Sequence, residues 1–283
     1  RIGVGKLGIR QVRFTGGEPL LRKSLEKIIA ATKELRTDQG RSPSTALTTN
    51  GLGLEKRAGA LAAAGLDRIN ISLDTIDRER YAALTRRDRL DHVLQAIAAA
   101  DAAGLHPIKI NAVVMPGVNE EDIVPLADYA VHHGAQLRFI EQMPLGPREQ
   151  WRREDMVTAE DILTRLRTHF SMEPAREPRG SAPAALWEVS APDGTRGTLG
   201  IIASVTHPFC GDCDRTRLTT DGAIRNCLFG NSETPLRDLL RSGASDEDIM
   251  EAWAGEMWTK KPGHGIDDEG FLQPDRPMSA IGG

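Results

Sequence analysis

Three cysteines, Cys210, Cys213 and Cys227, lie close together in a C-x2-C-x13-C pattern. Two thiols at this spacing can hold a metal from one tight turn, and Asp221-Gly222 predicts a hairpin that returns the third thiol to the first two. The spacing alone leaves two sites open, a structural zinc with His207 as the fourth ligand or an iron-sulfur cluster. The chain has no fourth cysteine, which favours a [4Fe-4S] cluster with three thiolate ligands and one iron free to meet another ligand.

Two arginines follow this pair of cysteines directly. Arg215 and Arg217 point to the same side of an extended segment, because side chains alternate with a period of two residues. A pair of guanidinium groups binds phosphate oxygens through bidentate hydrogen bonds. The alternative is two solvated arginines on a sheet edge, and the neighbouring cysteines favour a polyphosphate ligand beside the metal site.

The composition excludes several classes of protein. The net charge of −4 shows that the chain has no overall excess of basic residues, so nucleic acid is not an expected partner. No apolar run reaches the length of about 18 residues that a membrane-spanning helix needs, so no membrane association is expected. Three thiols without a visible export signal predict a reducing, cytoplasmic location.

The elements that position these residues alternate between strand and helix up to about residue 143, which is the pattern of a parallel α/β sheet. The predicted strands are Ile9–Thr15, Thr45–Asn50, Arg68–Asp74, Ile108–Met115 and Leu137–Met143, and the predicted helices are Ser24–Leu35, Leu54–Ala64, Leu90–Ala103 and Glu120–His133. One helical face, formed by Val93, Leu94, Ile97 and Ala98, is expected to pack against the sheet.

The pattern changes after residue 143, and a second unit rather than a further strand-helix repeat is expected there. It contains a helix near Thr158–Thr168, a loop over Glu173–Pro183, short strands at Ala185–Val189 and Leu199–Ala203, and helices near Leu236–Ser242 and Glu247–Met257. We therefore expect two regions, residues 1–143 and residues 144–283.

Polar residues gather at the carboxyl ends of the five predicted strands, where parallel α/β folds place their ligand sites. They are Gly16-Gly17-Glu18-Pro19, Thr48-Thr49-Asn50-Gly51, Ser72-Leu73-Asp74, Asn111 and Glu141-Gln142-Met143. Any one of them alone is better explained as a helix cap or a turn residue. Their coincidence at one edge predicts a site there.

These motifs resemble those of the GTP 3′,8-cyclase family, also called molybdenum cofactor biosynthesis protein A, within the radical S-adenosylmethionine (SAM) superfamily. The Gly-Gly-Glu-Pro loop is shared across that superfamily, whereas the cysteine pattern with its interleaved arginines is more specific. The resemblance runs from about residue 9 to the end, and its other segments are Val12–Thr15, Leu47–Gly51, Asn70–Asp74, Lys109–Asn111, Arg138–Glu141, Phe209–Arg217 and Gly282-Gly283.

The resemblance implies an incomplete (β/α)6 barrel of the TIM type, with the first strand missing here and a C-terminal α+β extension that binds a cluster. It also implies a lyase that converts GTP to 3′,8-cyclo-7,8-dihydroguanosine 5′-triphosphate in the first step of molybdenum cofactor biosynthesis. Two [4Fe-4S] clusters would serve this reaction, one cleaving SAM and the other holding GTP. Implied partners are a reductant protein, cyclic pyranopterin monophosphate synthase downstream and a second copy in a homodimer.

The resemblance also assigns roles to individual residues. Gly17, Glu18, Ser72 and Met143 would contact SAM, and Cys210, Cys213 and Cys227 would hold the C-terminal cluster. The residues implied to hold GTP are Arg13, Thr48, Lys109, Arg215, Thr216 and Arg217. The closing Gly282-Gly283 resembles a family tail that reaches back into the cavity, and a frayed terminus is the alternative.

One departure from the family pattern is the absence of the C-x3-C-x2-C motif that holds the SAM-cleaving cluster. We expect the chain to be a fragment, or a natural truncation, that does not cleave SAM by itself. Two other readings remain: another radical SAM enzyme with an auxiliary cluster, such as one that modifies a peptide or a tRNA, and a zinc-stabilised module without catalysis. Metal analysis separates the second of these, because a zinc protein is colourless and a four-iron protein is brown.

Overall fold

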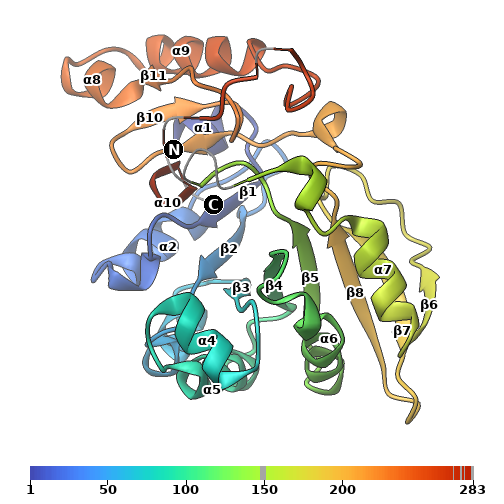
Figure 1. The fold of residues 1–283 in the computed structure, drawn as a ribbon. Coiled ribbons are helices and arrows are strands. Elements are labelled where there is room, and N and C mark those ends of the chain that lie inside the picture. Colours follow the sequence, from blue (N-terminus) through green and yellow to red (C-terminus); the bar gives the residue numbers. More distant parts are fainter. Residues whose placement is uncertain (147–150, 270, 275, 277, 282–283) are drawn as a thin grey trace.

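The structure is a computed structural model that describes residues 1–146, 151–269, 271–274, 276 and 278–281. Its main feature is an eight-stranded open sheet (Figure 1), in which the first five strands lie side by side in chain order and are all parallel. These are β1 (Gln11–Phe14), β2 (Ser44–Thr49), β3 (Arg68–Ser72), β4 (Ile108–Val114) and β5 (Gln136–Glu141). The expected α/β architecture of a partial barrel is confirmed.

The sheet continues beyond residue 143, which the sequence analysis did not predict. β8 (Arg196–Ile202) pairs in parallel with β5, so it acts as a sixth parallel strand, and β7 (Ala185–Ser190) and β6 (Ser171–Pro174) follow it in antiparallel pairing. The end of β6 lies within the segment expected to be a loop. Strand pairing depends on contacts between distant segments, so local sequence pattern does not reveal it.

Helices cover the outer face of the sheet (Figure 1). Before residue 170 they are α2 (Leu25–Lys33), α3 (Ala58–Ala63), α4 (Arg78–Thr85), α5 (Leu90–Ala102), α6 (Ile123–His132) and α7 (Ala159–Arg167). The short α1 (Ile2–Gly5) instead packs through Ile2 against Ile224, Leu236 and Ile249. Short 3-10 turns lie at Pro19–Leu21, Leu54–Lys56, Glu120–Asp122, Arg153–Asp155 and Cys210–Asp212. No helix in the described part of the chain is long and apolar enough to cross a membrane.

Alternation along the strands separates the apolar core from the inner face of the barrel. In β4, Ile108, Ile110 and Ala112 are buried against the helices, whereas Lys109 and Asn111 between them point to the opposite face. On α5 the buried face consists of Val93, Ala96, Ile97 and Ala100, so the expectation for Ala98, which is exposed, was wrong. The core stripe follows the i, i+3, i+4, i+7 pattern of a helix rather than adjacent pairs.

A second, smaller sheet carries the cysteines. It contains β9 (Arg217–Leu218), β10 (Ala223–Arg225) and β11 (Thr234–Pro235), and it is packed beside α8 (Leu236–Arg241) and α9 (Asp246–Trp258) through Ile224, Leu236 and Ile249. Figure 1 shows this unit on one side of the molecule, close to α1 and to the C-terminal α10 (Met278–Ile281).

Candidate functional site

The loop after β1 is tied to the end of β2 by one carboxylate. Glu18 accepts hydrogen bonds from the backbone N–H of Leu20 (2.9 Å), the hydroxyl of Thr49 (2.7 Å) and the backbone N–H of Asn50 (2.8 Å). Gly17 is exposed, and no atom of the described residues lies within 4 Å of the place where a Cβ would stand. The loop therefore leaves open backbone for a ligand, although three protein donors already occupy the Glu18 carboxylate.

The other two residues expected to contact SAM lie at the same edge of the sheet. Ser72 is the exposed last residue of β3, and Met143 follows β5 by two residues and is half-buried. Nearby, the Asp74 carboxylate accepts a hydrogen bond from the Val113 backbone at 2.8 Å, and burial raises the pKa of this carboxyl group. The carboxyl edge predicted from the sequence is thus assembled from several strands.

A group of basic side chains lies together on the inner face of the sheet and near the cysteine hairpin. Burial, and then the charges of Arg138, Arg68 and Arg13, lower the pKa of Lys109 to about 8. Burial, and then Arg13 and Arg68, lower the pKa of Arg138 to about 10. All the charges that shift these two groups are positive, so the described residues bring like charges together here. We call this the cation cluster: Arg13, Arg68, Lys109, Arg138, Arg215 and Arg217.

Arg13 lowers the pKa of Lys109 and of Arg138, and its own pKa is also lowered. Burial, and then Arg68 and Arg215, lower the pKa of Arg13, although part of its side chain remains accessible to solvent. A side chain that lines an open interior can be reached by a small probe and still be surrounded by protein atoms that reduce its hydration. The influence of Arg215 on Arg13 shows that the hairpin arginines lie close to the inner face of the sheet.

Strand register explains how Arg138 reaches this face. Arg138 on β5 pairs with Asn111 on β4 and with Gly200 on β8, and its Nε donates to the Asn111 side chain at 2.9 Å. A Cβ at Gly200 would stand 2.9 Å from Cγ of Arg138. The glycine therefore makes room for the arginine, which is only 4% exposed.

The two hairpin arginines carry N–H groups that lack partners. Nε and Nη2 of Arg215 and Nε of Arg217 are buried without a hydrogen-bond acceptor in the described part of the structure. Burial, and then the charge of Arg215, lower the pKa of Arg217 to about 10. The Arg215 guanidinium lies over the Phe209 ring, 4.9 Å from its centroid. Buried donors without acceptors cost about 1–3 kcal/mol each, so an anion that accepts from them would be bound strongly.

The three cysteines occupy a turn and a hairpin, as the sequence predicted. Cys210 begins a 3-10 turn in which the backbone N–H of Cys213 donates to the Cys210 carbonyl at 3.1 Å, and the hairpin turn uses Gly222 at φ 86°. Burial, and then Cys227 and Cys213, raise the pKa of Cys210, so the thiols are near one another. In the described ranges, no three His, Cys, Asp or Glu side chains are placed to hold a single metal ion.

Cys213 lies in a more positive environment than Cys210. Burial opposes ionisation of its thiol, but a hydrogen bond from the Arg215 backbone N–H, the Arg215 charge and Lys260 together lower the pKa of Cys213. The backbone N–H of His264 donates to Cys210. The histidine considered as a zinc ligand, His207, is exposed.

Two further residues expected to bind GTP have partners within the protein. The Thr48 hydroxyl accepts a hydrogen bond from the Asn70 side chain at 3.3 Å. Thr48 pairs with Asn70 between β2 and β3, and Asn70 pairs with Lys109 between β3 and β4. The Thr216 hydroxyl accepts from Nε1 of Trp253 at 2.9 Å, so it is held by α9. The expected tail Gly282-Gly283 lies outside the described residues.

Sequence reasoning assigned no role to Arg68, Arg138 or Lys260. For Arg138 a signal was available, since an arginine between the apolar residues Leu137 and Phe139 of a predicted strand needs a reason to be there. Lys260 gave no signal, because its importance depends on contact with a segment far away in the sequence.

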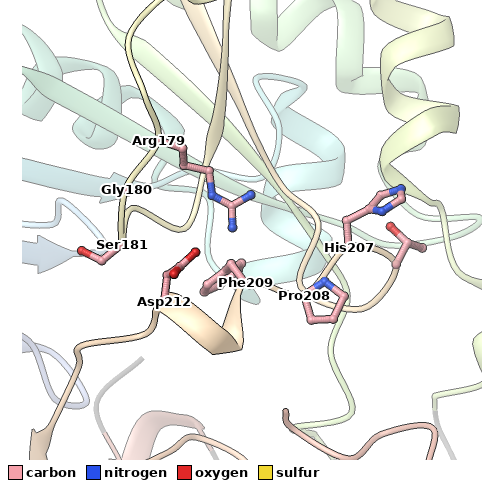
Figure 2. A pocket seen from close by; sticks show the side chains of 8 residues that line it. Arg179, Gly180, Ser181, His207, Pro208, Phe209 and Asp212 are labelled. Atoms are coloured by element: carbon pink, nitrogen blue, oxygen red, sulfur yellow. The ribbon is translucent and has the colours of Figure 1, made fainter. Parts of the chain in front are cut away.

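A separate pocket of about 870 Å³ lies outside the cation cluster. Figure 2 shows Arg179 pointing toward Phe209 and Asp212, and His207 pointing away from them. The Arg179 guanidinium lies over the Phe209 ring at 5.1 Å, so this ring contacts arginines from both the pocket and the cation cluster.

Comparison with known proteins gives a consistent result. Residues 1–130 match the model of the radical SAM superfamily, and residues 135–266 match that of Molybdenum Cofactor Synthesis C. The chain is 74% identical over 286 residues to GTP 3′,8-cyclase of Corynebacterium glutamicum, covering all of this chain and 76% of that protein. It is 58% identical over 283 residues to GTP 3′,8-cyclase 2 of Mycobacterium tuberculosis, covering all of this chain and 78% of that protein. The chain therefore belongs to the GTP 3′,8-cyclase family of the radical SAM superfamily.

Proposed function

We propose that this chain binds GTP in the cation cluster and takes part in its 3′,8-cyclisation, the first step of molybdenum cofactor biosynthesis. The observation that carries the proposal is the set of buried guanidinium N–H groups on Arg215 and Arg217 that have no acceptor in the described structure. A triphosphate carries about four negative charges at neutral pH, and its oxygens accept bidentate hydrogen bonds from such groups.

The remaining cations are proposed to hold the triphosphate from the inner face of the sheet. Arg13, Lys109 and Arg138 come from three different strands, so an extended phosphate chain can contact several of them at once. Thr48 and Thr216 are proposed to lie at the edge of the GTP site, since both have partners within the protein.

The cysteines fit an iron-sulfur cluster in the chemistry of their donor set. Cys210, Cys213 and Cys227 are close enough to influence one another, and cations nearby favour the thiolate forms that bind iron. We propose that these three residues hold a [4Fe-4S] cluster. When bound, such a cluster supplies an iron with one open coordination position for a ligand.

Membership of the radical SAM superfamily implies SAM and a [4Fe-4S] cluster as cofactors. We propose that Gly17, Glu18, Ser72 and Met143 contact SAM at the carboxyl edge of the sheet, with the open backbone at Gly17 approaching it most closely. Residues 1–143 would then serve SAM, and residues 144–283 would carry the second cluster together with two of the cations for GTP. The two family models, which meet between residues 130 and 135, support a division in this region.

Partners follow from this reaction. The proposal includes a reductant protein that supplies electrons, cyclic pyranopterin monophosphate synthase as the enzyme that consumes the product, and a second copy of the chain in a homodimer. The family resemblance supports these three, and the contacts in the chain support GTP itself.

The test is GTP binding by anaerobically reconstituted protein, measured by isothermal titration calorimetry. Arg217→Met removes a buried charge and its N–H donors while keeping an apolar stem, so GTP should bind at least 10-fold more weakly, equivalent to about 1.5–3 kcal/mol for a charge-assisted hydrogen bond. The variant should unfold at the same or a higher temperature than the wild type, because burial of an unpaired charge is unfavourable.

Arg237→Met is the matched control, since Arg237 is exposed and pairs with Asp238 on the surface. Unchanged GTP affinity in Arg217→Met would contradict the assignment of the site. Stoichiometric zinc without iron or sulfide in wild-type protein would contradict the proposed cluster. Competition between ATP and GTP for the site separates this family from other radical SAM enzymes. A GTP 3′,8-cyclase should prefer GTP, and another radical SAM enzyme should not.

A further inference from the structure

One face of α9 and the turn after it contacts both segments that carry the cysteines. Trp253 donates to the Thr216 hydroxyl, and the Glu256 carboxylate accepts from the hydroxyls of Ser232 and Thr234, each at 2.9 Å. Trp253 and Glu256 are three positions apart and so lie on one side of the helix, and Lys260 follows in the turn after the C-cap Thr259. α9 thus acts as a common support for the cysteine turn and the cysteine hairpin.

Lys260 makes the most direct of these contacts. Its Nζ donates to the carbonyl oxygen of Arg215 at 2.6 Å, although the two residues are 45 positions apart in the chain. The same ammonium group lies close enough to the Cys213 thiol to help lower its pKa, and Lys260 is half-buried, so water screens its charge only in part. An ammonium group has three N–H donors, so it can serve the carbonyl and the sulfur together.

We propose that Lys260 is a positioning residue for the cysteine site, which fixes the Arg215 backbone and places a positive charge against the sulfur of Cys213. This inference rests on the proposed cluster at Cys210, Cys213 and Cys227. Reduction adds a negative charge to a cluster, and a nearby cation stabilises that form. Lys260 therefore raises the reduction potential of the cluster and holds the Arg215 guanidinium in its position for phosphate.

The experiment compares three variants with the wild type. Lys260→Met removes the charge and the donors, Lys260→Arg keeps the charge, and Lys261→Met is the matched control because Lys261 is the adjacent, exposed lysine. After anaerobic reconstitution, the midpoint potential is measured by a redox titration followed by electron paramagnetic resonance. We expect a more negative midpoint in Lys260→Met, recovery of most of the shift in Lys260→Arg and no change in Lys261→Met.

A second readout does not need a cluster. Hydrogen exchange over residues 213–217 should become faster in Lys260→Met than in Lys261→Met, because the backbone of this segment loses its anchor. Equal midpoint potentials for these two variants, or equal exchange rates in protein without iron, would overturn the inference. Failure of the wild type to hold iron would instead overturn the proposed cluster, and the exchange experiment would still decide the role of Lys260.

Discussion

Glu141 connects the end of β5 to two other segments, and its replacement should destabilise the protein strongly. The carboxylate is fully buried and accepts four hydrogen bonds. One oxygen accepts from the Ala159 backbone (2.8 Å) and the Thr206 hydroxyl (2.5 Å), and the other accepts from the backbone N–H groups of Val205 (2.8 Å) and Thr206 (2.9 Å). It thereby joins the start of α7 to the segment that leads from β8 toward Cys210.

Glu141→Gln replaces one of these acceptor oxygens with an NH2 group. The less costly orientation places the NH2 group near the Thr206 hydroxyl, which can rotate to accept from it, and leaves the Ala159 N–H without an acceptor. That buried donor costs about 1–3 kcal/mol, and the remaining bonds weaken because they are no longer charge-assisted, so the total loss is about 3–5 kcal/mol. At about 2 °C per kcal/mol for a chain of this size, the melting temperature should fall by roughly 6–10 °C.

Thermal unfolding followed by circular dichroism measures this change. The matched control is Glu160→Gln, in the first turn of α7, because that carboxylate is mostly exposed and pairs only with Arg167 among the residues described. A surface change of this kind should alter the free energy of unfolding by less than about 0.5 kcal/mol. A melting temperature of Glu141→Gln within about 2 °C of the control would refute the reasoning, since ~2 °C is the shift expected for 1 kcal/mol at this size.

Three further predictions concern the cation cluster and the cysteine hairpin. The lowered pKa of Lys109, about 8, means that the free protein loses this charge above pH 8, so GTP affinity measured by calorimetry should fall about tenfold between pH 7 and pH 9. Because the unfolded chain keeps that proton up to a higher pH, the free energy of unfolding should rise over the same range. Gly200→Ala should displace Arg138 and weaken GTP binding several-fold, because the new Cβ would stand 2.9 Å from Cγ of Arg138. Glu233→Gln should destabilise the hairpin by about 3–5 kcal/mol, measured by hydrogen exchange, because it leaves the buried Arg225 guanidinium without its ion-pair partner.

Matched variants make these results specific. Lys109→Met should abolish the pH dependence of GTP affinity, and a slope that remains would assign it to another group. Gly59→Ala adds a Cβ with no atom of the described residues within 4 Å, so it should leave binding unchanged. Arg237→Gln removes an exposed ion pair near the hairpin and should leave hydrogen exchange there unaltered. If a test variant and its matched control change by a similar amount, the corresponding prediction is contradicted.

Local sequence pattern was sufficient to predict the first five strands and the position of the cysteine hairpin. Strand alternation and turn residues such as Gly222 act over a few positions, and the sequence shows them directly. The predicted helix over Leu54–Ala64 is instead a 3-10 turn followed by α3, and Arg57 between them pairs with Glu26 at 2.6 Å. This contact joins residues that are distant in sequence, so helical propensity could not reveal it.

The residues of the candidate site also divide into those placed by local sequence and those placed by contacts with distant segments. Arg215 and Arg217 could be identified beside the cysteines, because their spacing predicts a common side of an extended segment. Arg138 depends on a glycine in β8, a strand whose place in the sheet was not predicted, and Lys260 depends on a contact across 45 residues. Site residues were therefore predictable where the segment that bears them determines the geometry, and unpredictable where a different segment does.

The charges in the cation cluster support the proposal that it is a binding site rather than a structural ion network. A network that stabilises the fold places carboxylates between its cations, as Glu233 lies between Arg225 and Arg276 in this chain. In the cation cluster the charges that act on Lys109, Arg138 and Arg13 are all positive, and each of these groups has a lowered pKa. Such an arrangement lowers the stability of the free protein, because like charges repel in a partly dehydrated interior. An anion that binds there removes the repulsion, which adds to its affinity, so GTP should raise the melting temperature and high salt should reduce that rise.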